Sequence, residues 1–93
     1  MLNVLIADDE KKVGLLIKNL IEWERLGLHF LGMVQDGESA YDMIINEHPD
    51  IVITDIRMPK LTGLEMIEKV SAEGRKVHFI VVSGYRYFEY AQR

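Results

Sequence analysis

Length, composition and charge first limit what this chain can be. Its 93 residues are enough for one domain with one hydrophobic core. Hydrophobic residues make up 48% of the chain and charged residues 28%, which is typical of a globular protein and excludes a disordered segment. The net charge is −4 and the basic residues are dispersed, so this segment lacks a nucleic-acid-binding surface. The sequence has no cysteine, which excludes disulfides and thiolate chemistry.

Neither a run of about 18 apolar residues nor the pattern of a signal peptide is present, so we expect no membrane contact and a cytoplasmic location. Short β-branched runs alternate with segments of helical period, which indicates βαβ units and an open parallel α/β sheet. The run Ile51–Thr54 has the β-branched character of a strand buried on both faces, and Val4–Ala7 is interpreted in the same way. Four strands are predicted, over residues 3–8, 28–34, 51–55 and 77–83.

The first predicted helix follows the first strand and ends before Gly27. Trp23, near its end, is expected to be a packing residue. Four apolar residues recur at the spacing of one helical face, so we expect this face to be buried. They are Val13, Leu16, Ile17 and Leu20.

Two more helices are predicted, over about residues 37–47 and 62–73. Thr62 is the expected N-cap of the later one, with Glu65 three residues on as in a capping box, and Gly74 is the expected stop. The earlier helix should end before Pro49. Its buried stripe is expected to consist of Ala40, Met43 and Ile44.

Acidic residues follow both apolar strands at their carboxyl ends. Asp8 and Asp9 come after the first strand and Asp55 after the third. Parallel neighbours lie roughly 4.8 Å apart, so these three carboxylates should meet and repel one another. A bound divalent cation is the simplest way to offset this repulsion. A site with a few carboxylates, a carbonyl and waters as ligands is suited to Mg²⁺. Asp50, at the other end of the third strand and about 16 Å away, is expected to be solvated.

Residues 85–93 look like the opening of a fourth helix that the chain does not complete, with Phe88 and Ala91 on one face. A sheet that stops there leaves its fourth strand as an unpaired edge. We therefore expect a fragment of a larger domain that is capable of self-association.

Three motifs together resemble the receiver domain of two-component response regulators. They are Ala7-Asp8-Asp9-Glu10, Asp55-Ile56-Arg57-Met58-Pro59 and Ser83-Gly84. The resemblance covers residues 1–93 in order. It implies a flavodoxin-like (CheY-like) doubly wound α/β fold with strand order 2-1-3-4, incomplete at its C-terminus because the fifth strand and last helix are missing.

The resemblance also implies a role for each of five residues. Asp55 matches the phospho-acceptor, to which a sensor histidine kinase transfers the phosphoryl group, and Ser83 matches the switch hydroxyl. Asp9 matches the direct Mg²⁺ ligand, Asp8 its neighbour acting through water, and the main-chain carbonyl of Arg57 the remaining ligand. Such a domain is a signalling module that assists its own phosphotransfer and dephosphorylation, and it relays phosphorylation as a conformational change.

Residues 23–28 and 83–91 further resemble receivers fused to AraC-type transcription regulators, which implies that DNA is contacted only through an output domain absent from this chain. The family's lysine after the fifth strand is also absent. A phosphorylation-independent interaction module, or a nonfunctional fragment, is therefore the alternative. A magnesium-dependent hydrolase with Asp55 as nucleophile lacks a separate general acid or base, and a nucleotide-binding domain lacks the Gly-rich loop after the first strand.

Overall fold

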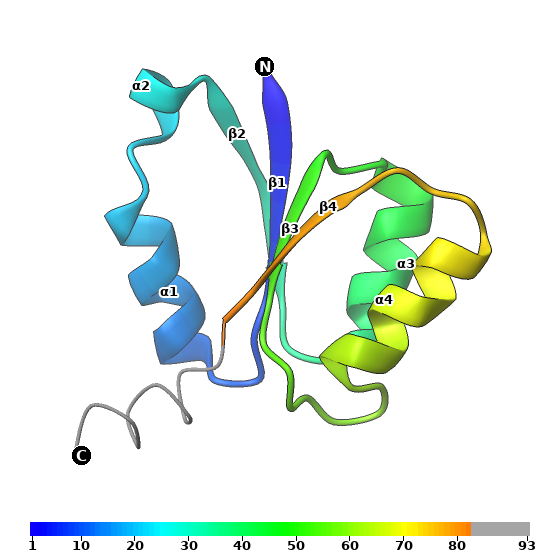
Figure 1. Ribbon diagram of the computed structural model, residues 1–93. Helices are drawn as coiled ribbons and strands as arrows, with labels where there is room; N and C mark the ends of the chain where they lie inside the picture. Colours follow the sequence, from blue (N-terminus) through cyan, green and yellow to red (C-terminus); the bar gives the residue numbers. More distant parts are fainter. Residues whose placement is uncertain (83–93) are drawn as a thin grey trace, which may run out of the picture.

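The computed structural model describes residues 1–82, in which helices cover both faces of a four-stranded sheet (Figure 1). All strand pairs are parallel and their order is β2-β1-β3-β4, as predicted. No helix within this part of the chain is long and apolar enough to cross a membrane. The elements are, in chain order, β1 (Leu2–Ala7), α1 (Lys11–Leu20), α2 (Trp23–Leu26), β2 (Leu28–Val34), α3 (Gly37–Glu47), β3 (Ile51–Thr54), α4 (Gly63–Ala72) and β4 (His78–Val81).

Helices α3 and α4 form where local signals predict them. Helix α3 has the predicted bounds, and α4 begins directly after its predicted N-cap, Thr62. The capping box is present, because Thr62 Oγ1 accepts a hydrogen bond from Glu65 N–H at 3.1 Å and Glu65 Oε1 accepts one from Thr62 N–H at 3.0 Å. Gly74 has a φ of +72° just beyond the C-cap, as suits a helix stop.

The segment after the first strand differs from the prediction, because it forms two helices instead of one. Helix α1 ends at Leu20, Ile21 is extended, and the single turn α2 follows. In a continuous helix Trp23 would point about 180° away from the buried Gly14, toward solvent. The break lets the Trp23 ring pack against Phe30 of β2, with centroids 5.6 Å apart, and lets Trp23 Nε1 donate to the Lys18 carbonyl at 2.8 Å.

The two faces of the sheet carry separate hydrophobic clusters, and both helices α3 and α4 cover the same face (Figure 1). That face has eight buried residues in its cluster: Leu5, Ala7, Ala40, Ile44, Val52, Met58, Met66 and Val70. The other face is covered by α1 and α2, and its cluster has three buried residues: Val4, Ile6 and Ile53. Core burial is therefore concentrated under α3 and α4.

The prediction for the buried stripe of the first helix is wrong in two of its four positions. Val13 and Ile17 are half-buried as expected, but Leu16 is 58% and Leu20 72% exposed. The apolar stripe of α1 is thus wider than the part of the helix surface that contacts the sheet. Within residues 1–82, no second long helix lies on this face to bury the remaining leucines.

Candidate functional site

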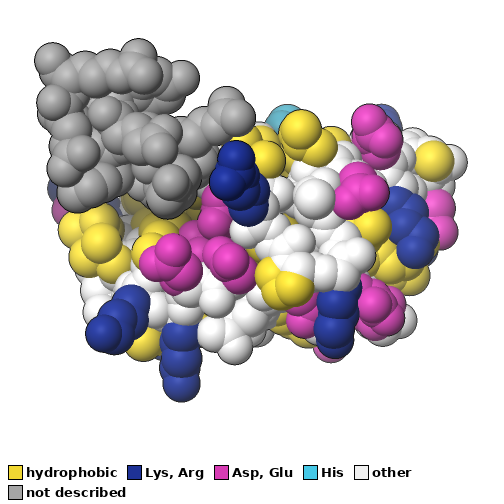
Figure 2. Space-filling model, turned by 90° about the horizontal axis from the view of Figure 1, so that it is seen from below, with side chains coloured by type: hydrophobic (Ala, Val, Ile, Leu, Met, Phe, Trp, Pro, Cys, Tyr) yellow, Lys and Arg dark blue, Asp and Glu magenta, His cyan; other side chains and the backbone are white. Residues whose placement is uncertain are grey.

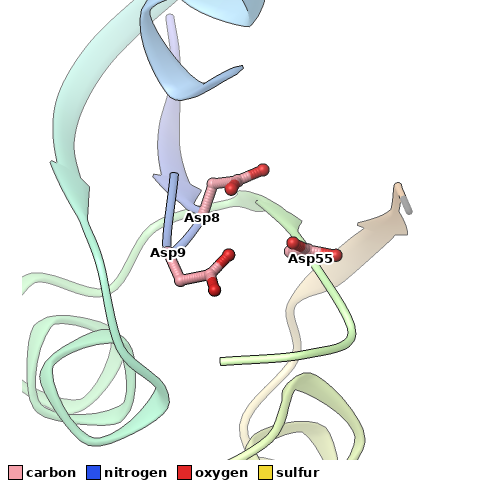
Figure 3. Close-up of side chains that lie close together, drawn as sticks. All are labelled: Asp8, Asp9 and Asp55. Atoms are coloured by element: carbon pink, nitrogen blue, oxygen red, sulfur yellow. The ribbon is translucent and has the colours of Figure 1, made fainter. Parts of the chain in front are cut away.

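The ends of β1 and β3 bring Asp8, Asp9 and Asp55 together. Ala7 and Thr54 are register partners, and Asp55 N–H donates to the Ala7 carbonyl at 2.9 Å. One carboxylate oxygen from each of the three aspartates lies within 4.8 Å of the others. Figure 3 shows the three side chains directed toward one shared space, and Figure 2 shows acidic side chains gathered on this end of the molecule. The structure thus places them as close as parallel-strand geometry predicts.

Asp8 is the buried member of the cluster, with 2% of its surface exposed. Burial is the largest cause that raises its pKa to about 6, and the negative charges of Asp55, Asp9 and Glu10 add to it. The Glu10 N–H donates to Asp8 Oδ1 at 2.9 Å and opposes the shift. Asp8 is therefore a carboxylate whose charge the protein alone does not compensate.

Asp55 is half-buried and follows the last residue of β3. Ile56 N–H donates to its Oδ1 at 2.7 Å, which orients the carboxylate. The pKa of Asp55 is raised, first by burial and further by the charge of Asp9. The fully buried Thr54 fixes the turn, because its Oγ1 donates to the Asp55 carbonyl oxygen at 2.9 Å.

The loop after Asp55 is anchored to the core by Met58, which is 7% exposed and packs in the cluster beneath α3 and α4. Arg57 precedes Met58 in this loop and its side chain is exposed. That its main-chain carbonyl is a Mg²⁺ ligand stays a prediction. The Pro59 carbonyl oxygen accepts a hydrogen bond from Gly37 N–H of α3 at 3.4 Å, and the Ile56 carbonyl oxygen accepts one from Gly63 N–H of α4 at 2.8 Å. The loop is thus held from both α3 and α4.

Two glycines that the sequence analysis overlooked allow this close packing. A Cβ at Gly63 would lie 2.1 Å from the Asp55 carbonyl oxygen, and one at Gly37 would lie 1.9 Å from the Leu61 carbonyl oxygen. Real Cβ atoms do not approach oxygen so closely, so only glycine fits. The sequence signal was available, since each glycine follows a helix N-cap, a place where nothing local demands glycine.

Two other residues named from the sequence stand apart from this cluster. Ser83, the predicted switch hydroxyl, lies outside the described residues. Asp50 is half-buried instead of solvated, because its Oδ2 accepts a hydrogen bond from Asn3 N–H at 2.7 Å. Asp50 therefore ties the start of β1 to the start of β3, and the prediction that it is solvated is wrong.

The cluster has the character of a magnesium site. Its potential ligands are carboxylate oxygens, which hard divalent cations prefer, and they come from rigid strand ends. Burial and mutual repulsion raise the pKa of both Asp8 and Asp55, so a cation would relieve charge that the chain leaves uncompensated. The residues present therefore fit Mg²⁺.

Comparison with known proteins gives concordant results. Residues 4–93 match the family described as the response regulator receiver domain. The uncharacterized transcriptional regulatory protein YesN of Bacillus subtilis is 48% identical over 92 residues, which are 99% of this chain but only 25% of that protein. The chain thus spans about a quarter of the length of this relative.

Solved structures agree with this match. The REC domain of AraT, a response regulator from Geobacillus stearothermophilus, has a TM-score of 0.85 at 32% identity, covering 98% of this chain and 70% of that one. The CheX-CheY-BeF3-Mg²⁺ complex from Borrelia burgdorferi has a TM-score of 0.78 at 27% identity, covering 88% of this chain and 61% of that one. The CheY-like fold predicted from the sequence is confirmed.

Proposed function

This chain belongs to the response regulator receiver domain family, and we propose that it accepts a phosphoryl group on Asp55 in a magnesium-dependent transfer from a sensor histidine kinase. The observation that carries the proposal is the meeting of Asp55 with two further carboxylates at the end of the sheet. Asp55 follows β3 and is half-exposed, whereas Asp8 follows β1 and is buried. The CheX-CheY-BeF3-Mg²⁺ complex from Borrelia burgdorferi supports the same chemistry here.

Asp55 acts as the nucleophile in this proposal. A carboxylate oxygen attacks the phosphorus of the phosphohistidine in line with the phosphorus–nitrogen bond, and that bond breaks as its electron pair returns to the imidazole nitrogen. The product is an acyl phosphate on Asp55. The hydrogen bond from Ile56 N–H at 2.7 Å holds the carboxylate in one orientation during the approach.

Asp9, Asp55 and the Arg57 carbonyl are the proposed protein ligands of Mg²⁺, with Asp8 acting through water. Bound there, the ion supplies the positive charge that offsets repulsion between the carboxylates and the incoming phosphoryl anion. Asp8 has to be ionised to take part. With a pKa of about 6 it is mostly ionised at neutral pH, and it becomes protonated in mildly acidic buffer.

Phosphorylation is proposed to act through Ser83, whose hydroxyl would bond the new phosphate and draw its loop with it. We propose that this change is relayed to a transcription-regulating output domain, through which alone DNA is bound, and that the protein acts in the cytoplasm. The similarity to YesN, a transcriptional regulatory protein four times as long as the matched segment, supports such an output. Residues 1–93 are proposed to belong to a single receiver domain.

Incubation with acetyl phosphate and Mg²⁺, followed by intact-mass measurement, tests the proposal. We expect a phosphate-sized mass increase that requires Mg²⁺ and disappears in Asp55→Asn. Asp42→Asn, an exposed aspartate of α3, is the matched control and should keep the increase. A folded chain that gains no mass and binds no Mg²⁺ would instead support the phosphorylation-independent interaction module.

A further inference from the structure

The loop between β3 and α4, which we call the acceptor loop (residues 55–62), rests against the first turn of α3. The Pro59 carbonyl oxygen accepts a hydrogen bond from Gly37 N–H at 3.4 Å. The Leu61 carbonyl oxygen is so near that a Cβ added at Gly37 would meet it at 1.9 Å. Main chain therefore packs directly against main chain, and a side chain at position 37 could not rotate out of the way.

Lys60, between these two contacts, has a backbone conformation that residues with a side chain rarely adopt. Its φ is +71°. His48, the other non-glycine residue with a positive φ in the described part of the chain, is the C-cap of α3, where this conformation is common. Lys60 caps no helix. Such strain persists where the surrounding contacts impose it, and here the contacts of Pro59 and Leu61 with Gly37 do so.

Charge also draws the loop toward α3. Asp36 is the N-cap of this helix, and its carboxylate accepts hydrogen bonds from Ser39 N–H at 2.7 Å and Ser39 Oγ at 2.9 Å. The pKa of Asp36 is lowered, first by the bond from Ser39 N–H and further by the positive charge of Lys60. The ionised carboxylate and the Lys60 ammonium therefore attract each other, which helps to hold the strained residue at the start of α3.

The same loop carries the proposed site. Asp55 is its first residue, and the carbonyl of Arg57 is a proposed ligand. Helix α4 holds the beginning of the loop, because Gly63 N–H donates to the Ile56 carbonyl oxygen at 2.8 Å. Helix α3 holds the residues that follow Arg57. Because Mg²⁺ requires near-ideal octahedral geometry, the direction of a main-chain carbonyl ligand depends on both contacts.

We propose that the first turn of α3 positions the acceptor loop for magnesium binding, with Gly37 and Lys60 as positioning residues. This inference rests on the proposed function and extends it to a helix that contributes none of the three aspartates. The two residues act through the main chain of the loop and make no contact with the ion. Groups that orient the ligands of a metal affect its affinity in this way.

Gly37→Ala tests the contact, since it adds one methyl group and leaves every proposed ligand in place. We expect the Mg²⁺ dissociation constant, measured by isothermal titration calorimetry, to rise by about tenfold, because α3 and the loop have to move apart. Phosphorylation by acetyl phosphate should slow at low Mg²⁺ and recover in part at saturating Mg²⁺. The matched control is Gly32→Ala in β2, where the new Cβ would lie 3.1 Å from Met43 Cε, the end of a flexible side chain.

Lys60→Gly tests the strained residue without adding bulk, because glycine adopts a positive φ freely. Removing a positive charge would by itself strengthen cation binding, so weaker binding has to come from a loosened loop. We expect a Mg²⁺ dissociation constant about threefold higher and faster hydrogen exchange of the Gly37 amide. The matched control is Lys76→Gly, an exposed lysine in the loop before β4, at the other end of the sheet.

Circular dichroism and thermal melting establish that each variant is folded. The proposal is overturned if folded Gly37→Ala and Lys60→Gly chains bind Mg²⁺ as tightly as the natural chain. It is overturned equally if the two controls lose as much affinity as the variants. A natural chain that binds no Mg²⁺ refutes the proposed function together with this inference, whereas unchanged variants of a chain that binds Mg²⁺ refute the inference alone.

Discussion

The two faces of the sheet use similar apolar sequences but differ in how completely those side chains are buried. Beneath α3 and α4, eight residues form one buried cluster, and Met58 extends it to the loop that follows Asp55. Beneath α1, three strand residues are buried, while Leu16 and Leu20 remain exposed. The closed face is the one that holds the acceptor loop in place. On the face beneath α1, residues 1–82 bury fewer apolar side chains.

Removing a side chain from each face should give the largest contrast in stability. Met66 of α4 is fully buried, so Met66→Ala is expected to lower the free energy of unfolding by about 2–5 kcal/mol through lost burial and the cavity left behind. Leu16→Ala should change it by no more than about 0.5 kcal/mol, because the side chain is already 58% exposed. Urea denaturation at a concentration where the chain is monomeric measures both. Equal losses would mean that α1 is held as tightly as α4.

Asp8, where the two faces meet at the acidic edge, should make stability depend on pH. Its folded-state pKa is about 6 against an ordinary 3.8, so its stabilising contribution is complete below about pH 4 and is lost as the pH rises through about 6. The loss is on the order of 3 kcal/mol in magnesium-free buffer. Asp55, whose pKa is also raised, acts in the same direction.

Thermal and urea unfolding of the natural chain and Asp8→Asn at several pH values would measure this contribution. Asp36 and Glu65 have lowered pKa values and act in the opposite direction, so the informative quantity is the difference between the two chains. The free energy of unfolding of Asp8→Asn should increase relative to that of the natural chain as the pH rises. Added Mg²⁺ should reverse this trend near neutral pH, because it stabilises the natural chain. A difference independent of pH would contradict the expectation.

Replacing a glycine by alanine should lower the free energy of unfolding by different amounts on the two faces. At Gly63 the new Cβ would meet the Asp55 carbonyl oxygen at 2.1 Å, which α4 can relieve only by moving away from the acceptor loop. We expect a loss of about 1–3 kcal/mol and slower phosphorylation by acetyl phosphate. At Gly14 the new Cβ would meet Met33 Sδ at 2.3 Å, part of a flexible side chain that can rotate away.

The Gly14→Ala variant should therefore be close to the natural chain in stability, since the better helix propensity of alanine, worth about 1 kcal/mol, offsets the displacement of Met33. Urea denaturation and the rate of mass gain with acetyl phosphate compare the two variants. A Gly63→Ala chain phosphorylated at the natural rate would show that α4 does not position Asp55.

Local signals in the sequence were sufficient for most of the elements. Helix α3 and the capping box at Thr62 form as predicted, because hydrogen bonds within four residues and a strong apolar period determine them. The same reasoning failed at Trp23, where the contact with Phe30 and the bond to the Lys18 carbonyl ended the helix early. It also failed at Asp50, whose partner Asn3 is 47 residues away.

The sequence by itself determined the parallel α/β architecture and the meeting of Asp8, Asp9 and Asp55, because adjacent parallel strands end at a common edge. Only the tertiary structure decided that Asp8 is buried with a pKa of about 6 while Asp55 stays half-exposed. It alone decided that Leu16 and Leu20 remain exposed despite a perfect helical period. Periodicity specifies which side chains share a face, whereas burial depends on what other segments of the chain pack against that face.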